Sequence, residues 1–262
     1  MSEETEFFSP ALGQEYGEFW DKTAATIEGA RYGVGGYPFG KPPSDYSLFW
    51  QGLAVAKFIQ EHLDLSEDDE LLEVGIGIGR IARHLLPLVR EYHAADISTA
   101  MLLHAAAGLR GHGNLSLHRL ESCDLRIFPS ESFDKVFFQH VLIHLDPEDV
   151  FNYLREARRV LRPGGRAYFQ FYNLLHEGGF REFIHAADQT IVQGGRQRGA
   201  VRCHTAEEVR FLVERAGLEM IEEKSHLERV HQRFSWHPDP DWKFYLIAVA
   251  GRPESAPKGT AR

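Results

Sequence analysis

The sequence predicts an α/β fold, in which a mostly parallel sheet is covered by helices on both faces. Segments with apolar residues at helical spacing alternate with short apolar segments of strand type, as in parallel βα units. One of these strands, residues 71–74, runs directly into three glycines spaced two apart, Gly75, Gly77 and Gly79. Glycine is needed where the backbone turns sharply and approaches a ligand, because a Cβ would block the approach. A ligand-binding loop is therefore expected where this strand ends.

The remaining elements follow from periodicity and from capping residues. Helices are predicted where apolar residues recur at helical spacing, at about 49–63, 81–88, 99–109, 147–161 and 206–216. Strands are predicted at 71–74, before Asp96, at 132–138, 167–172, 218–226 and 242–250. Ser98 caps one helix, Asp146 with Pro147 begins another, and Thr205 with Glu208 forms a capping box. These signals set the order of the βα units.

An acidic residue follows the glycine loop at the spacing of a ribose-binding carboxylate. Asp96 lies about 20 residues beyond the loop, at the end of the next predicted strand. The dinucleotide fingerprint G-x-G-x-x-G would need glycine at position 80, where this chain has Arg80. An NAD(P)-dependent oxidoreductase therefore stays an alternative that the glycine spacing disfavours.

The loop, written E-x-G-x-G-x-G from Glu73, resembles that of class I S-adenosylmethionine (SAM)-dependent methyltransferases, in particular the type 11 and 12 enzymes that act on small molecules. Asp96-Ile97-Ser98-Thr99-Ala100-Met101 resembles their exit from the second strand, and residues 120–125, 132–138 and 160–166 resemble further blocks. The resemblance covers about residues 47–173. It implies a Rossmann-like, seven-stranded sheet of order 3-2-1-4-5-7-6, with the seventh strand antiparallel.

The same resemblance implies SAM as the cofactor. Glu121 stands where relatives carry the acidic residue that accepts from the adenine amino group, with Asp124 as a competitor, and Ser122 would offer its backbone N–H to the ring. Gln139 would contact the methionine part. The expected cofactor-binding residues are Glu73, Gly75, Gly77, Gly79, Asp96, Ile97, Met101, Glu121, Ser122 and Gln139.

Two histidines follow the predicted strand 132–138 and are the catalytic candidates, because histidine is the usual base near neutral pH. His140 and His144 are four residues apart and would share a face if the stretch were helical. We assign His140 to substrate contact and His144 to an orienting or structural role, and a structural role stays open for both. Further candidates are His176, His231 and His237. No metal site is predicted, since an H-E-x-x-H pattern and cysteine pairs at metal spacing are absent from the sequence.

Two segments lie outside the predicted strands and helices of the sheet. Residues 1–46 are rich in aromatics and glycines, with 32–40 read as a mobile loop, and residues 174–204 separate the predicted strand 167–172 from the next helix. Ligands of open α/β sheets bind beyond the carboxyl ends of the strands, so both segments are expected to cap the acceptor site. The methyltransferase domain is then 47–252, and 253–262 is expected to be a disordered tail. Packing of the first aromatics on the sheet is the alternative.

The composition of the chain limits the kinds of methyl acceptor that are expected. The formal net charge is −9, whereas nucleic-acid binders usually carry a basic face. Neither a leader nor an apolar run of about 18 residues is apparent, which together with two cysteines favours a cytoplasmic protein without membrane contact. We therefore expect a SAM-dependent methyltransferase of a small molecule, such as one of secondary metabolism. A protein of the same fold without methylating activity is a further alternative. The acceptor atom and the oligomeric state stay open.

Overall fold

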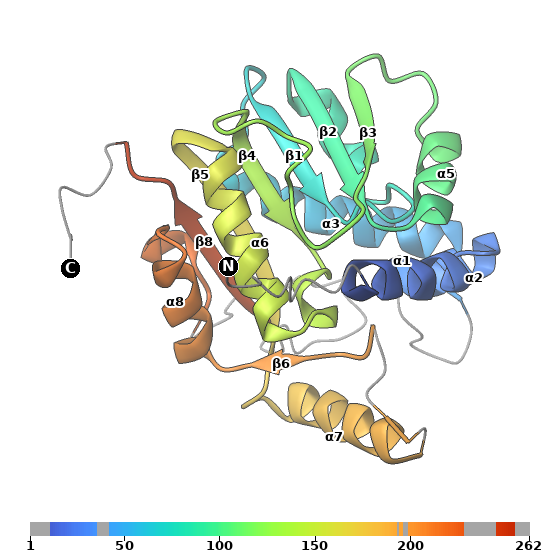
Figure 1. Ribbon diagram of the computed structural model, residues 1–262. Coiled ribbons are helices and arrows are strands. Elements are labelled where there is room, and N and C mark those ends of the chain that lie inside the picture. The colour runs from blue at the N-terminus through green and yellow to red at the C-terminus, as the bar shows by residue number, and fades with distance from the viewer. Residues whose placement is uncertain (1–10, 36–41, 193, 196–198, 228–244, 255–262) are drawn as a thin grey trace, which may run out of the picture.

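A computed structural model describes residues 11–35, 42–192, 194–195, 199–227 and 245–254. At its centre lies a sheet of order β3-β2-β1-β4-β5-β8-β7, to which β6 adds a short pairing with β5 (Figure 1). The strands are β1 Glu70–Val74, β2 Glu91–Asp96, β3 Leu115–Arg119, β4 Phe133–Phe138, β5 Leu161–Asn173, β6 Cys203–His204, β7 Glu219–Met220 and β8 Tyr245–Gly251. Strands β1 to β5 pair in parallel, and β8 is antiparallel to both of its neighbours.

The predicted strand order is confirmed, because β8 and β7 occupy the places expected for the seventh and sixth strands. The two-residue β6 is an addition that the sequence did not indicate. It lies in the segment after α7 and pairs with the end of β5 at Tyr172 and Asn173. This pairing draws the segment between β5 and the next helix back to the sheet.

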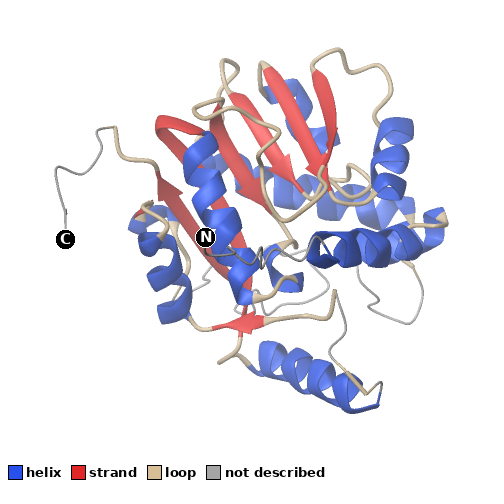
Figure 2. Ribbon diagram, in the orientation of Figure 1, coloured by secondary structure: helices blue, strands red, loops and turns tan. Residues whose placement is uncertain are grey.

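Helices cover both faces of the sheet (Figure 2). They are α1 Ala11–Thr23, α2 Ile27–Gly35, α3 Asp45–Leu63, α4 Ala82–Leu85, α5 Thr99–Gly108, α6 Pro147–Val160, α7 Glu177–Val192 and α8 Ala206–Arg215, with 3-10 turns η1 Leu86–Leu88, η2 Leu142–His144 and η3 Glu222–Lys224. The apolar faces of α6 and α8 bury Leu154 and Val213 against one side, and α3 buries Ile59 on the other. Figure 1 shows α1 and α2 crossing the end toward which the parallel strands point.

Capping residues begin the helices largely as predicted. The Ser98 hydroxyl accepts from the Met101 N–H at 3.1 Å, and the Thr205 hydroxyl accepts from the Glu208 N–H at 3.2 Å. Asp146 occupies the N-cap position of α6, but its side chain makes no capping hydrogen bond. The carboxylate instead pairs with Arg202, at 3.2 Å between Oδ1 and Nη2. A tertiary ion pair has therefore replaced the local cap.

Two local predictions are wrong. The strand expected at 218–226 is limited to β7, and the chain then turns through η3. There the Ser225 hydroxyl accepts from the Val249 N–H at 3.0 Å, so a side chain takes the place of a backbone ladder bond. Of the mobile loop expected at 32–40, residues 32–35 end helix α2, and 36–40 lie outside the described residues. Gly33 allows α2 to pack closely, since a Cβ there would lie 3.2 Å from both Trp20 and Met101.

Among the described residues, no helix is long and apolar enough to cross a membrane. His231, His237 and residues 255–262 of the predicted tail lie outside the described residues.

Candidate functional site

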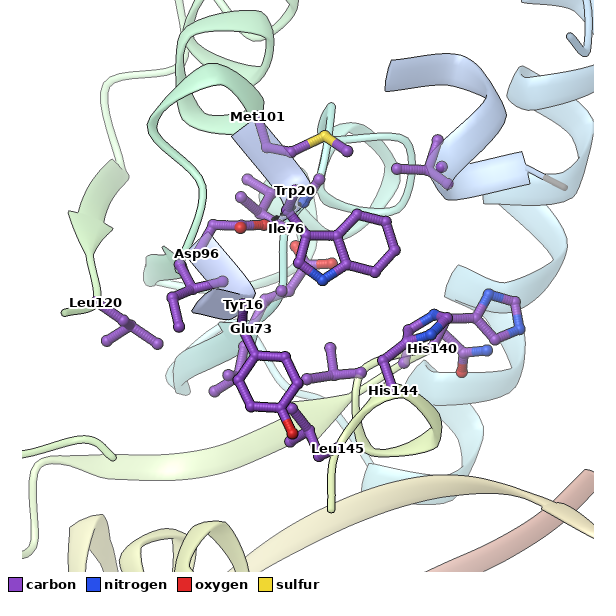
Figure 3. Close-up of a pocket in the computed structure, with 18 of the residues that line it drawn as sticks. Tyr16, Trp20, Glu73, Ile76, Asp96, Met101, Leu120, His140, His144 and Leu145 are labelled. Atoms are coloured by element: carbon purple, nitrogen blue, oxygen red, sulfur yellow. Dashed lines mark hydrogen bonds between the residues drawn. The ribbon is translucent and has the colours of Figure 1, made fainter. Parts of the chain in front are cut away.

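A cavity of about 810 Å³, counting its open mouth, lies where β1, β2 and β4 end. Figure 3 shows Asp96 and Leu120 on one side of this pocket and His140 and His144 on the other, with Trp20 between them. The topology explains the position of the pocket, because ligands of open α/β sheets bind at the carboxyl ends of the strands.

The glycine loop forms the floor of the pocket and is tied to β2. Gly75 and Gly77 have φ angles of +82° and +56°, which side-chain-bearing residues rarely adopt. The Asp96 carboxylate accepts from the Gly77 N–H at 2.9 Å and from the Ser98 N–H at 2.8 Å. The loop also has a helix above it, since a Cβ on Gly77 would lie 2.5 Å from Val34. Glycine is therefore needed here both for φ and for the approach of α2.

Two carboxyl groups are buried in the pocket wall. Burial raises the pKa of Glu73 to about 8, although a hydrogen bond donated by the Tyr92 hydroxyl at 2.6 Å opposes the rise. Burial likewise raises the pKa of Asp96 to about 6, opposed by the N–H groups of Ser98 and Gly77. Low-dielectric surroundings disfavour the charged form of an acid. Both groups would gain from a positive or hydrogen-donating ligand.

Arg80 is a buried cation at the far end of the loop, with 7% of its surface exposed. Its Nη2 lies 3.2 Å from Nδ1 of His140 and donates to it. Burial lowers the pKa of the guanidinium, and the nearby Glu73 carboxyl opposes that change. From the sequence Arg80 was only a departure from the dinucleotide pattern. Its charge became informative only once the fold placed it inside a cavity.

The lining fits the predicted cofactor SAM. Asp96 at the end of β2 can accept from ribose hydroxyls, and Glu73 and Arg80 match an ammonium and a carboxylate. Leu120 lies on the Asp96 side of the pocket, and Ile97, which follows Asp96 in the chain, adds to the apolar surface, suited to an adenine ring. A ligand with one cationic, one anionic and one flat apolar part would satisfy all these groups.

Most of the predicted cofactor residues line this pocket, namely Glu73, Gly75, Gly77, Asp96, Ile97, Met101 and Gln139. Gly79, Glu121 and Ser122 are not part of the lining. Gly79 packs on Leu109, which a Cβ would approach to 2.6 Å. Glu121 is exposed, and its neighbours Leu120 and Cys123 line the wall instead. The adenine contact assigned to Glu121 stays a prediction.

The two candidate histidines both line the pocket, but they do not share a helical face. His140 precedes η2 and has a φ of +58°, so the chain reverses there instead of continuing as a helix. The His140 N–H donates to Oε1 of Gln170 at 2.9 Å, which holds this conformation. His144 is the last residue of η2. The two rings thus reach the pocket through different local structures.

The surroundings fix opposite tautomers for these histidines. Nδ1 of His144 lies 2.8 Å from the Gly199 carbonyl oxygen and must donate to it, which leaves Nε2 as an acceptor. Burial, aided by the charge of Arg202 and opposed by the hydrogen bond to Gly199, lowers the pKa of His144 to about 4, so the ring is neutral at physiological pH. His140 accepts from Arg80 at Nδ1, and its neutral form therefore carries the proton on Nε2.

Helices α1 and α2 belong to the segment expected to cap the acceptor site, and they supply a wall of the pocket whose residues were not among the predicted site residues. Tyr16 and Trp20 face the pocket, as Gly33 and Val34 do from α2. Trp20 packs edge-on against His144, with ring centroids 4.9 Å apart. The Tyr16 hydroxyl accepts from the Asp146 N–H at 3.1 Å. The spacing of four residues between the two aromatics was the available signal, because it places them on one face of a helix.

The segment 174–204 reaches this site only at its end. None of its described residues lines the pocket, and His176 instead accepts at Nδ1 from the Gly178 N–H at 3.1 Å. The contacts come from the Gly199 carbonyl to His144 and from the Arg202 N–H to the Ile143 carbonyl, at 2.6 Å. The expected role of residues 174–204 as a cap over the acceptor site stays a prediction. The described residues contain no group of three or more potential metal-binding side chains.

The known sequences that this chain resembles are methyltransferases. Residues 72–169 match the family model described as a methyltransferase domain. The chain is 27% identical over 227 residues to N-terminal Xaa-Pro-Lys N-methyltransferase 1 of Rattus norvegicus, covering 86% of this chain and 90% of that protein. It is also 27% identical over 221 residues to methyltransferase GfsG of Streptomyces halstedii, covering 81% and 75%.

Solved structures share the fold. The 4+2 cyclase SpnF matches with a TM-score of 0.64 at 18% identity, covering 93% of this chain and 97% of that one. A SAM-dependent methyltransferase of Leishmania major matches with a TM-score of 0.62 at 19% identity, covering 91% and 82%. These likenesses concern the architecture of the sheet and its helices.

Proposed function

We propose that this chain, a class I SAM-dependent methyltransferase, methylates an oxygen of an uncharged small molecule. The proposal rests mainly on the acceptor end of the pocket, which is formed by Trp20, His140 and His144. The only carboxylates in the described lining, Glu73 and Asp96, belong to the glycine loop region. A cationic acceptor would therefore find no acidic partner there that the cofactor does not already use.

Bound SAM supplies a methyl group on a sulfonium sulfur, which departs as a neutral thioether when an acceptor lone pair displaces it. The chain mainly has to align the acceptor and exclude water. Trp20 and Val34 close the pocket from the side of α1 and α2. Glu73, Asp96 and Arg80 hold the polar ends of the cofactor.

A hydroxyl acceptor must lose its proton as the new oxygen–carbon bond forms. His144 is suited to accept that proton, because its Nδ1–H is engaged by the Gly199 carbonyl and its Nε2 bears the lone pair. The ring is held by Trp20 at its edge. The proton then passes from Nε2 to solvent. This assignment reverses the roles first expected for the two histidines.

A second candidate acceptor is the α-amine of a protein N-terminus. The relatives named N-terminal Xaa-Pro-Lys N-methyltransferase favour it, because the alignment spans most of both chains. The identity of 26–27% leaves room for a changed acceptor. The absence of an acidic partner at the described acceptor end argues for the neutral small molecule instead.

The test is product mass after incubation with methyl-labelled SAM and separate pools of acceptors. One pool holds hydroxylated aromatic and alicyclic metabolites, and the other holds peptides beginning Xaa-Pro-Lys. We expect label in the first pool and in no peptide. Labelled peptides with an unlabelled metabolite pool would reject the small-molecule acceptor, and label in neither pool with intact SAM binding would reject both.

A further inference from the structure

Gln170 is an anomalous residue in the centre of the sheet. It lies in β5 between Phe169 and Phe171, and only 1% of its surface is exposed. A buried amide costs free energy unless its polar atoms are hydrogen-bonded. Oε1 accepts from the His140 N–H, whereas Nε2 is buried and has no hydrogen-bond partner among the described residues. Because only one of its two polar atoms is hydrogen-bonded, packing alone does not explain a glutamine at this position.

The pleat of β5 explains where this side chain acts. Phe169 and Phe171 pack in the core beneath α6 and α8, so Tyr168 and Gln170 point to the opposite face. In the register of the two strands, Phe137 and Phe138 pair with Tyr168 and Phe169. Gln170 therefore lies beside the residues that follow the end of β4, which are the ones that turn into the pocket.

Two alternate residues of β5 bind two consecutive residues of this turn. The Tyr168 hydroxyl donates to Oε1 of Gln139 at 2.9 Å, and Gln170 accepts from the backbone N–H of His140 at 2.9 Å. Gln139 and His140 both line the pocket, whereas Gln170 does not. The strand thus fixes the direction of two pocket residues without entering the pocket.

His140 requires such support because its backbone is strained. A φ of +58° is unfavourable for a residue with a Cβ, and it persists only where the surroundings hold it. The ring is held as well, because Arg80 donates to Nδ1 at 3.2 Å. Backbone and imidazole are therefore restrained by partners from two different elements, β5 and the glycine loop.

We propose that Gln170 is a positioning residue, which holds the left-handed turn at His140 and thereby sets this imidazole at the acceptor end of the pocket. The role rests on the proposed function, because the acceptor is what His140 would orient. It explains why a polar residue occupies a buried position where an apolar side chain would pack without an orphaned amide.

The first test compares Gln170→Met, which removes the acceptor oxygen, with Gln170→Glu, which keeps one. Gln60→Met, a half-buried glutamine of α3 away from the pocket, is the control. We expect Gln170→Met to lower kcat for the methyl acceptor roughly ten-fold while the Kd for SAM stays within about two-fold. Gln170→Glu should recover most of the turnover, and Gln60→Met should match wild type. A Gln170→Met enzyme with wild-type kcat would overturn the proposal, as would an equal loss of SAM binding.

The second test needs no acceptor and separates this inference from the proposed function. His140→Gly relieves the strain of a positive φ, so Gln170→Met should lower the melting temperature less in that background than in wild type. The same comparison decides the matter if Gln170→Met alone fails to fold, since it should then fold in the His140→Gly background. Equal effects in both backgrounds would show that Gln170 does not hold this turn. Failure to find any methyl acceptor would reject the proposed function while leaving this result intact.

Discussion

The Asp96 carboxylate and the Gly77 N–H are joined by a 2.9 Å hydrogen bond, so the end of β2 holds the glycine loop that follows β1. The same carboxylate accepts from the Ser98 N–H, at the start of α5. One side chain therefore ties the loop, the strand and a helix together at the position where ribose hydroxyls are expected. Cofactor binding and loop geometry depend on the same oxygen atoms.

For Asp96→Ala we expect an affinity for SAM at least roughly ten-fold weaker than that of wild type, because charge-assisted hydrogen bonds contribute about 1.5–3 kcal/mol. Titration calorimetry measures the effect, with the exposed Asp68→Ala as the control. Wild-type affinity in Asp96→Ala would place the ribose elsewhere.

Gly77→Ala should weaken SAM binding and lower the melting temperature. The substitution adds a Cβ at a φ of +56° and brings it to 2.5 Å from Val34. Val34→Ala removes that atom, so the double variant should recover part of the stability lost in Gly77→Ala. The recovery is read from thermal unfolding of both single variants and the double variant. Strictly additive losses would mean that α2 does not pack on this loop in solution.

Glu73 should make the stability of the cofactor-free protein fall as the pH rises. Its pKa is raised from 4.5 to about 8 by burial, so the folded state binds more protons than the unfolded state between these values. The resulting decrease in the free energy of unfolding is absent below pH 4.5, grows up to about pH 8 and is constant above it, reaching on the order of a few kcal/mol. Glu73→Gln keeps an acceptor for the Tyr92 hydroxyl and removes the ionisation. From pH 5 to pH 8.5, the free energy of unfolding of the wild type should fall relative to that of Glu73→Gln. The same change with pH in both proteins would contradict the buried state of Glu73.

His144→Asn and His144→Gln separate the two nitrogens of the ring. Asn retains a donor for the Gly199 carbonyl but lacks a group in place of Nε2, so it should keep the fold and lose turnover by roughly 10²-fold. Gln, which loses the Nδ1 donor, should be less stable. The exposed His112→Gln is the control. Turnover near that of wild type in His144→Asn would exclude His144 as the proton acceptor.

The pH profile gives an independent check on His144. A base must be neutral to accept a proton, and the pKa of His144 is lowered to about 4, so the residue is competent at all pH values well above 4. We therefore expect no acidic limb from this group in kcat/KM between pH 6 and 9. A limb in that range that disappears in His144→Asn would show that the ring is far less buried than the structure indicates.

The sequence predicted the parts of the site that depend on local chain geometry. The glycine loop and Asp96 follow from the order of a strand, a tight turn and a second strand, and the pocket lies where they end. The turn at His140 could not be predicted, because Gln170, thirty residues away, selects its positive φ. The wall of Tyr16 and Trp20 also depends on tertiary packing, since α1 could have packed elsewhere on the sheet.

The acceptor class is the central claim, and a competition experiment tests it most directly. The protein is incubated with SAM carrying a ¹³C-methyl group and with equal concentrations of an active hydroxylated metabolite and a peptide beginning Xaa-Pro-Lys. The chemical shift of the transferred methyl carbon distinguishes an O-methyl from an N-methyl product. The account predicts an O-methyl signal on the small molecule and none on the peptide. An N-methyl signal on the α-amine of the peptide would contradict it.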